Sequence, residues 1–139
     1  MGRIVGLDFG KARIGVAISD EMQIIARALG TVPNTPQFVH NLRLLLTKEG
    51  EIDKIVVGLP LTLKGQDSEM TLLARSFASN LTTDFSLSIE LWDERLTSTM
   101  IEKSLQEAGL NRKKRAEKSD ALSAVLILQS YLDCKKDLP

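Results

Sequence analysis

The chain has 139 residues, which favours a single domain, residues 1–139, with a hydrophobic core of its own. It is 43% hydrophobic and 26% charged, a composition typical of a soluble globular protein. Lys plus Arg and Asp plus Glu both number 18, so no excess of positive charge indicates a nucleic-acid partner, although a balanced total can contain a local basic patch. The single Cys134 excludes an internal disulfide. The apolar run around residues 4–7 is too short for a signal peptide or a membrane span, so we expect a cytoplasmic protein without a membrane partner.

Three strands are expected at the start of the chain. Residues 3–9 form an apolar run ending in Asp8-Phe9-Gly10, which is typical of a buried strand followed by a turn. Residues 14–18 predict a second strand that can pair with the first as a hairpin across residues 10–13. Residues 24–32 match a third strand less well, and Pro33 would end it.

The middle of the chain alternates helices and strands. Apolar residues at helical spacing predict a helix that Gly50 would end, and a β-branched run bounded by Gly58 is typical of a parallel strand inside a sheet. The expected elements are a helix over residues 38–48, a strand over 52–57, a helix over 68–81 and a strand over 85–92.

Two helices are expected at the end of the chain. Thr97 or Thr99 can cap the first, which Gly109 would end. Ser119 can cap the second, over residues 120–133, whose largely apolar circumference favours deep packing. This order predicts an α/β fold with a mixed five-stranded sheet. Its first three strands are antiparallel and the later ones parallel, and helices cover both faces.

Three carboxylates lie at the edges of segments that we expect to be buried. Asp8 ends the first strand and Glu94 follows the last one, where an ionised side chain is unfavourable unless something neutralises it. Asp120 begins the final predicted helix, where the helix dipole alone would favour an acidic residue by about 0.3–1 kcal/mol. Each also has an ordinary explanation, as a turn residue, a charged corner or a helix-end residue, and Asp93 is an alternative to Glu94.

The predicted fold can bring Asp8, Glu94 and Asp120 to one point. Three carboxylates in one place repel each other unless a cation joins them, and Mg²⁺ or Mn²⁺ is the natural occupant of a site built from oxygen ligands. A pair of such ions can orient a water and stabilise the leaving oxygen of a phosphodiester. The three residues are therefore candidate metal ligands and candidate catalytic residues.

Basic residues near these carboxylates are candidate phosphate ligands. Lys11 and Arg13 lie in the predicted hairpin turn, where they could hold a phosphate, although a solvated turn explains them equally well. Residues 111–118 are expected to form a loop that could grip a nucleic-acid backbone beside Asp120. The basic candidates in this loop are Arg112, Lys113, Lys114 and Arg115. Aromatic residues make up 4% of the chain, which favours recognition of phosphates and strand shape over base stacking.

Five short segments occur in order along nearly the whole chain. They are Gly6-Leu7-Asp8-Phe9-Gly10, Arg13-Ile14-Gly15-Val16-Ala17, Val57-Gly58-Leu59-Pro60-Leu61, Asp93-Glu94-Arg95-Leu96-Thr97 and Ser119-Asp120-Ala121-Leu122-Ser123-Ala124. Together they resemble the YqgF family of Holliday junction resolvases, also described as pre-16S ribosomal RNA nucleases. The resemblance implies an RNase H-like fold and a divalent-metal nuclease. It also implies acidic site residues at Asp8, Glu94 and Asp120, with Arg13 and Arg95 near the site.

Several alternatives stay open. Lys11-Ala12 departs from the family pattern, in which a small polar residue precedes a basic one, so the role of Lys11 is not decided. The Asp-x-Gly opening also resembles actin- and Hsp70-like ATPases, but these enclose a nucleotide between two such domains. A non-catalytic assembly factor that binds structured RNA or a DNA junction is a further alternative. The substrate is either RNA or branched DNA. A symmetric junction would call for a homodimer, whereas rRNA processing permits a monomer.

Overall fold

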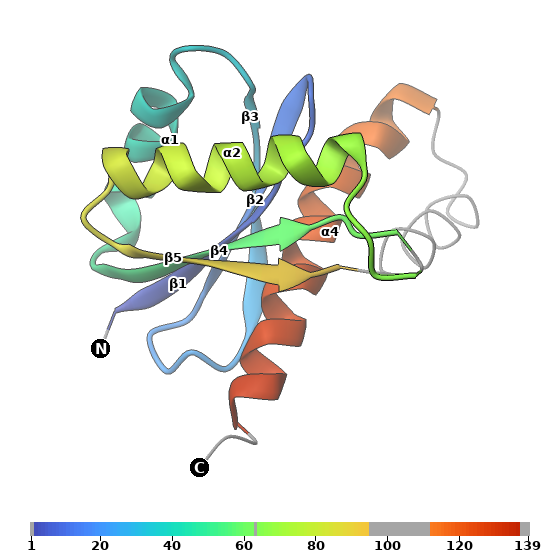
Figure 1. The fold of residues 1–139 in the computed structure, drawn as a ribbon. Helices are drawn as coiled ribbons and strands as arrows, with labels where there is room; N and C mark the ends of the chain where they lie inside the picture. Colours follow the sequence, from blue (N-terminus) through green and yellow to red (C-terminus); the bar gives the residue numbers. More distant parts are fainter. Residues whose placement is uncertain (1, 63, 95–111, 137–139) are drawn as a thin grey trace.

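Five strands form one mixed sheet at the centre of the molecule (Figure 1). The computed structural model describes residues 2–62, 64–94 and 112–136, except for the side chains of residues 112–119 and 136. The strands are β1 Arg3–Asp8, β2 Arg13–Ser19, β3 Ala26–Pro33, β4 Ile52–Leu59 and β5 Ser88–Asp93. Their order is β3-β2-β1-β4-β5, with antiparallel pairing from β3 to β1 and parallel pairing from β1 to β5. The predicted mixed sheet is therefore confirmed.

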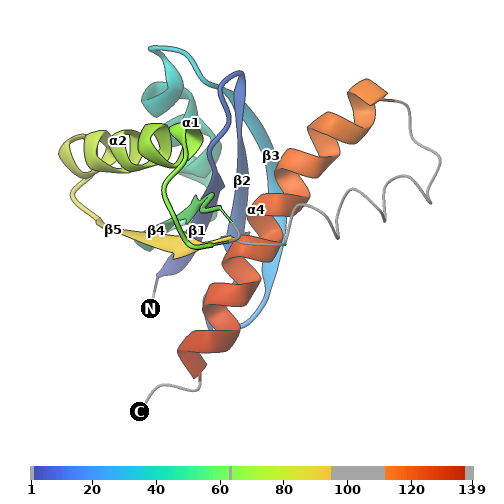
Figure 2. The same cartoon turned by 45° about the vertical axis from the view of Figure 1, so that its right-hand side comes forward.

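Helices cover both faces of this sheet (Figure 2). Helices α1 Phe38–Leu46 and α2 Glu69–Asp84 lie on one face, and α4 Arg112–Lys136 crosses the other. Successive side chains of a strand point to opposite faces, so Val5 of β1 enters the core beneath α1 and α2, whereas Ile4 enters the core beneath α4. We call these two sides the α1/α2 face and the α4 face.

The helices of the α1/α2 face each bury one stripe of side chains. In α1 the buried residues recur every four positions, at Phe38, Leu42 and Leu46. The predicted end of this segment at Gly50 is confirmed, with a φ of 84° after a short 3-10 turn. α2 begins at a capping box, in which Ser68 Oγ accepts from the Thr71 N–H and Thr71 Oγ1 accepts from the Ser68 N–H. Both predicted helices are confirmed.

The final helix is longer than the sequence predicted. α4 begins at Arg112 rather than after a cap at Ser119, so the basic stretch that was expected to be a loop is helical. Arg, Lys, Ala and Glu all favour a helix, and no Gly or Pro occurs between Gly109 and Pro139 to interrupt one. Asp120 consequently lies more than two turns inside α4. The helix dipole, which acts within the first turn, therefore does not explain this residue.

Other boundaries also differ from the expected ones by a few residues. α2 continues to Asp84, so β5 begins at Ser88, later than expected. β3 begins at Ala26 because the preceding residues form a turn around the Asp20 side chain. Asp20 Oδ1 accepts hydrogen bonds from the backbone N–H groups of residues 24 and 25, which takes them out of the strand ladder.

Residues 95–111 lie outside the described part of the chain. The helix expected there, from Thr97 or Thr99 to Gly109, stays a prediction. Of the helices within the described residues, none combines the length and the apolar character that a membrane span requires. α4 reaches 25 residues but carries charged residues at both ends.

Candidate active site

The structure brings Asp8, Glu94 and Asp120 together at one edge of the sheet, on the α4 face. Strands β1, β4 and β5 run parallel, so their carboxyl ends reach the same edge. Asp8 is the last residue of β1, and Glu94 directly follows β5. Asp120 belongs to α4 and is near enough for its charge to act on the Asp8 carboxyl. Three distant parts of the sequence therefore supply the three acidic side chains.

Side chains alternate between the two faces of the sheet along β5, and this alternation determines whether Asp93 or Glu94 lies on the α4 face. Trp92 packs into the core of the α4 face, so Asp93 points to the other face and Glu94 returns to the α4 face. Asp93 is exposed, whereas Glu94 is half-buried and its carboxyl group interacts with that of Asp8. The Glu94 N–H also donates to the Leu59 carbonyl at 3.2 Å, which holds the residue beside β4. The structure therefore places Glu94, and not Asp93, beside Asp8.

Gly15 of β2 allows α4 to lie close against the sheet beside Asp120. A Cβ added to Gly15 would stand 2.0 Å from the Asp120 carbonyl oxygen, well inside van der Waals contact. Only glycine permits this approach, which brings Asp120 to the level of the strand ends. Sequence reasoning missed this role, although a glycine inside an apolar strand is a known signal of close backbone approach.

Gly58 of β4 makes room for the Glu94 carboxylate in the same way. A Cβ at Gly58 would stand 2.2 Å from Glu94 Oε2 and 2.4 Å from Ile127 Cδ1. The sequence predicted that Gly58 bounds its strand, which is wrong, because it lies inside β4 and pairs with Trp92 of β5. Its function in the fold is to leave space between β4 and α4.

Burial raises the pKa values of both strand-end carboxyls. The pKa of Asp8 rises to about 8, chiefly because the group is buried, and further because the charges of Glu94 and Asp120 lie nearby. The pKa of Glu94 rises to about 7, again chiefly through burial; the hydrogen bond with Asp8 opposes this rise, and the charge of Asp93 adds a smaller contribution to it. In the absence of a cation, the Asp8–Glu94 pair therefore keeps a proton near neutral pH.

The third carboxylate is held by a basic residue of β2. Arg13 Nε donates to Asp120 Oδ2 in an ion pair, and both side chains are 31% exposed. Arg13 reaches this position because it shares a face of β2 with Gly15, two residues further on. Burial raises the pKa of Asp120, and the hydrogen bond and charge of Arg13 oppose that rise.

The oxygen donors at this edge suit a hard divalent cation. Asp8 and Glu94 present two carboxylates that already share a proton, and a dication would replace that proton favourably. With Asp120 engaged by Arg13, no three acidic, His or Cys side chains within the described residues are grouped closely enough to hold an ion. The residues fit such an ion as a pair, and Asp120 must change partner to join them.

Lys11 is the other candidate phosphate ligand whose side chain is described. It is exposed in the β1–β2 hairpin and pairs at 3.8 Å with Glu69, the first residue of α2, rather than with the acidic site residues. Arg95 lies outside the described residues. The remaining candidates, Arg112, Lys113, Lys114 and Arg115, form the first turn of α4, which extends past the sheet (Figure 2).

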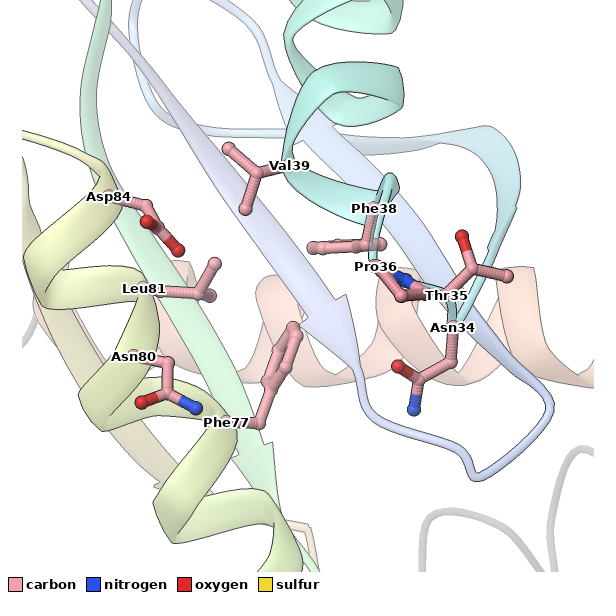
Figure 3. Close-up of a pocket in the computed structure, with 9 residues that line it drawn as sticks. All are labelled: Asn34, Thr35, Pro36, Phe38, Val39, Phe77, Asn80, Leu81 and Asp84. Carbon is pink, nitrogen blue, oxygen red and sulfur yellow. The ribbon is translucent and has the colours of Figure 1, made fainter.

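A pocket of about 140 Å³ lies on the opposite side of the sheet, between α2 and the segment that begins α1 (Figure 3). Its lining includes Phe77 and Asp84 but no Lys or Arg. Phe9, which follows Asp8, points to this side and packs against Phe77 with ring centroids 5.0 Å apart. The pocket therefore lies on the α1/α2 face, away from the carboxylates, and lacks the cations that a phosphate group requires.

A family model described as "RuvX: Holliday junction resolvase" matches residues 2–134. The chain belongs to this family. A protein of Koribacter versatilis named "Putative pre-16S rRNA nuclease" is 47% identical over 95% of this chain and 87% of its own length. A protein of the same name from Protochlamydia amoebophila is 43% identical over 96% of this chain and 94% of its own. The predicted family is confirmed, and these descriptions indicate a nuclease, a hydrolase of phosphodiester bonds.

The fold of the chain is also similar to that of solved structures. Its fold is similar to that of a structure described as Thermus thermophilus RuvC in complex with Holliday junction substrate, with a TM-score of 0.55 at 14% identity. The similarity covers 97% of this chain and 96% of that one. At this low identity the likeness concerns the fold alone, and it confirms the predicted RNase H-like α/β architecture.

Proposed function

We propose that this RuvX-family chain is a single-domain, divalent-metal-dependent endonuclease that hydrolyses phosphodiester bonds in structured nucleic acid in the cytoplasm. Its substrate is either the precursor of 16S rRNA or a Holliday junction. The names of the family and of its relatives support both substrates. The observation that carries the proposal is the half-buried Asp8–Glu94 pair at the carboxyl edge of the sheet, beside Asp120.

In this proposal Asp8, Glu94 and Asp120 hold Mg²⁺ or Mn²⁺. When bound, the cation supplies positive charge that stabilises the charge developing on the phosphate and on the leaving oxygen. Asp8 and Glu94 are fixed by strand ends and by the backbone bond from Glu94 to Leu59, so they approach a ligand without reorganisation. Burial on the α4 face limits the access of water and strengthens the attraction between these carboxylates and a cation.

The basic side chains would position the nucleic acid beside this edge. Among the basic side chains that the structure describes, Arg13 contacts one of the acidic residues, because its guanidinium is paired with Asp120. The first turn of α4 carries four consecutive basic residues and leads away from the sheet, so it would extend the contact along a phosphate backbone. Arg95 and Lys11 are further candidates. Such contacts fix the register of the substrate without reading its sequence. A monomer and a homodimer both fit the proposal.

Cleavage assays with wild type and Asp8→Asn test the proposal. Both proteins are incubated with a labelled 16S rRNA precursor fragment and with a labelled four-way DNA junction, in Mg²⁺, in Mn²⁺ and in excess chelator. We expect the wild type to cut at least one substrate only with a divalent ion, and Asp8→Asn to bind that substrate without cutting it. Cleavage in chelator, or equal cleavage by the variant, would contradict the metal site. Binding without cleavage under every metal would favour a non-catalytic assembly factor.

A further inference from the structure

The carboxylate that would complete the metal site belongs to Asp120, and it is already engaged in an ion pair with Arg13. Asp120 is nearly fixed in place, because its backbone lies against Gly15, where even a Cβ would clash at 2.0 Å. Arg13 is anchored on β2, which is paired along its whole length with β3. Only the ends of these two side chains are therefore free to rearrange.

Asp120 stands between two alternative partners. Its charge acts on the Asp8 carboxyl, so it lies within electrostatic reach of the Asp8–Glu94 pair. Its Oδ2 nevertheless accepts from Arg13 Nε, and no group of three described acidic, His or Cys side chains is arranged to hold an ion. Without a cation this arrangement is the favourable one, because the guanidinium neutralises a carboxylate that would otherwise repel the Asp8–Glu94 pair.

We propose that Arg13 is a latch that holds Asp120 away from the metal position until a divalent ion binds to Asp8 and Glu94. Asp120 then exchanges the guanidinium for the ion, and the released Arg13 side chain becomes available to a phosphate of the substrate. The latch rests on the proposed metal-dependent function. It couples metal loading to the exposure of a phosphate-binding group, so that Arg13 offers its full set of donors only when the metal is in place.

A purely structural role for Arg13 makes a different prediction. If the ion pair only fastened β2 to α4, removing the guanidinium would loosen the site and weaken metal binding. If Arg13 competes with the metal for Asp120, removing it strengthens metal binding. Both side chains of the pair are 31% exposed, so the competing interaction is modest. We expect a gain in Mn²⁺ affinity of about fivefold, which corresponds to about 1 kcal/mol.

Calorimetric titration of Mn²⁺ into the wild type and four variants separates these roles. The variants are Arg13→Gln, Lys11→Gln, Asp120→Asn and the double variant that combines Arg13→Gln with Asp120→Asn. Arg13→Gln is expected to bind Mn²⁺ about fivefold more tightly than wild type. Lys11→Gln is the matched control, since it removes the same charge from the same hairpin but from a side chain that pairs with Glu69. Its Mn²⁺ affinity should stay close to that of the wild type. In an Asp120→Asn background the gain from Arg13→Gln should disappear, because the contested ligand is absent.

The outcomes distinguish the latch from the function on which it rests. Equal or weaker Mn²⁺ binding by Arg13→Gln, or the same gain with and without Asp120, would overturn the latch alone. No binding of Mn²⁺ by the wild type would overturn the proposed metal site, and the latch with it. A second measurement avoids the substitution at Arg13. The ¹⁵N–¹H signal of its Nε should shift when Mg²⁺ is added to the wild type and stay unchanged in Asp8→Asn, and an unmoved signal in metal-bound wild type would contradict the exchange.

Discussion

Replacing Asp8 by Asn tests whether the buried carboxyl destabilises the metal-free protein at neutral and alkaline pH. The pKa of Asp8 is raised from 3.8 to about 8, chiefly by burial, so the folded protein holds this proton more tightly than the unfolded chain does. The stabilisation that comes from binding this proton is fully present below the pKa that Asp8 has in the unfolded chain. It is lost as the pH rises through the pKa that Asp8 has in the folded protein. The free energy of unfolding of the wild type should therefore fall between about pH 4 and about pH 8.

The size of this effect follows from the pKa interval. One pKa unit corresponds to about 1.4 kcal/mol, so the rise from 3.8 to about 8 sets a ceiling of about 6 kcal/mol. Neighbouring dipoles and water adjust around the ionised carboxylate, so we expect on the order of 2–4 kcal/mol. Asn keeps the shape of the side chain and carries no charge. Asp8→Asn should therefore be more stable than the wild type by this amount at about pH 9, and nearly equal to it at about pH 4.

Urea unfolding in the presence of chelator measures this difference, with the fluorescence of Trp92, the single Trp of the chain, as the signal. Asp84→Asn is the control, because it removes a carboxyl from an exposed position on the α1/α2 face, away from the Asp8–Glu94 pair. A difference between Asp8→Asn and wild type that stays constant with pH would refute the reasoning. A variant less stable than wild type at alkaline pH would refute it as well.

Three further substitutions test how the fold positions the site. Gly15→Ala should push α4 away from β2 and lower the free energy of unfolding by about 2–4 kcal/mol, and a melting temperature equal to wild type would contradict the close approach. Gly58→Ala should displace the Glu94 carboxylate and weaken Mn²⁺ binding by about tenfold, as measured by calorimetry. An unchanged Mn²⁺ affinity would show that Glu94 does not need the space beside Gly58. Ser68→Ala should remove the cap of α2 and lower the free energy of unfolding in urea by about 1 kcal/mol. The Mn²⁺ affinity should stay unchanged, and a change in it would contradict the separation of the cap from the site.

The sheet and its two faces were predictable because they depend on local patterns. Asp8 ends an apolar run that is buried on both sides, and the β-branched run before Gly58 is long enough only for a strand. The chain order of these elements then restricts the topology to a mixed sheet with right-handed crossovers. The placement of Asp8 and Glu94 at the carboxyl edge follows from the same order, since parallel strands end together.

The position of Asp120 and its partner depended on contacts that no local pattern reports. A run of charged residues is compatible with a loop or with a helix, so the start of α4 at Arg112 was not predictable from charge. The contact between Arg13 and Asp120 joins residues more than a hundred positions apart and requires the glycine at Gly15 to let the helix approach. The choice between Asp93 and Glu94 likewise required the register of β5, because alternation assigns the faces only once the strand bounds are known.

The most direct test of the account compares Glu94→Gln with Asp93→Asn in single-turnover cleavage of the substrate that the wild type cuts. The two substitutions remove the same charge from adjacent residues, but Glu94 lies beside Asp8 on the α4 face and Asp93 is exposed on the other side. We predict that Glu94→Gln lowers the cleavage rate by about a thousandfold or more, as expected for loss of a metal ligand, and that Asp93→Asn changes it by less than about threefold. Equal losses in the two variants, or a larger loss for Asp93→Asn, would contradict the assignment of the nuclease site to this edge of the sheet.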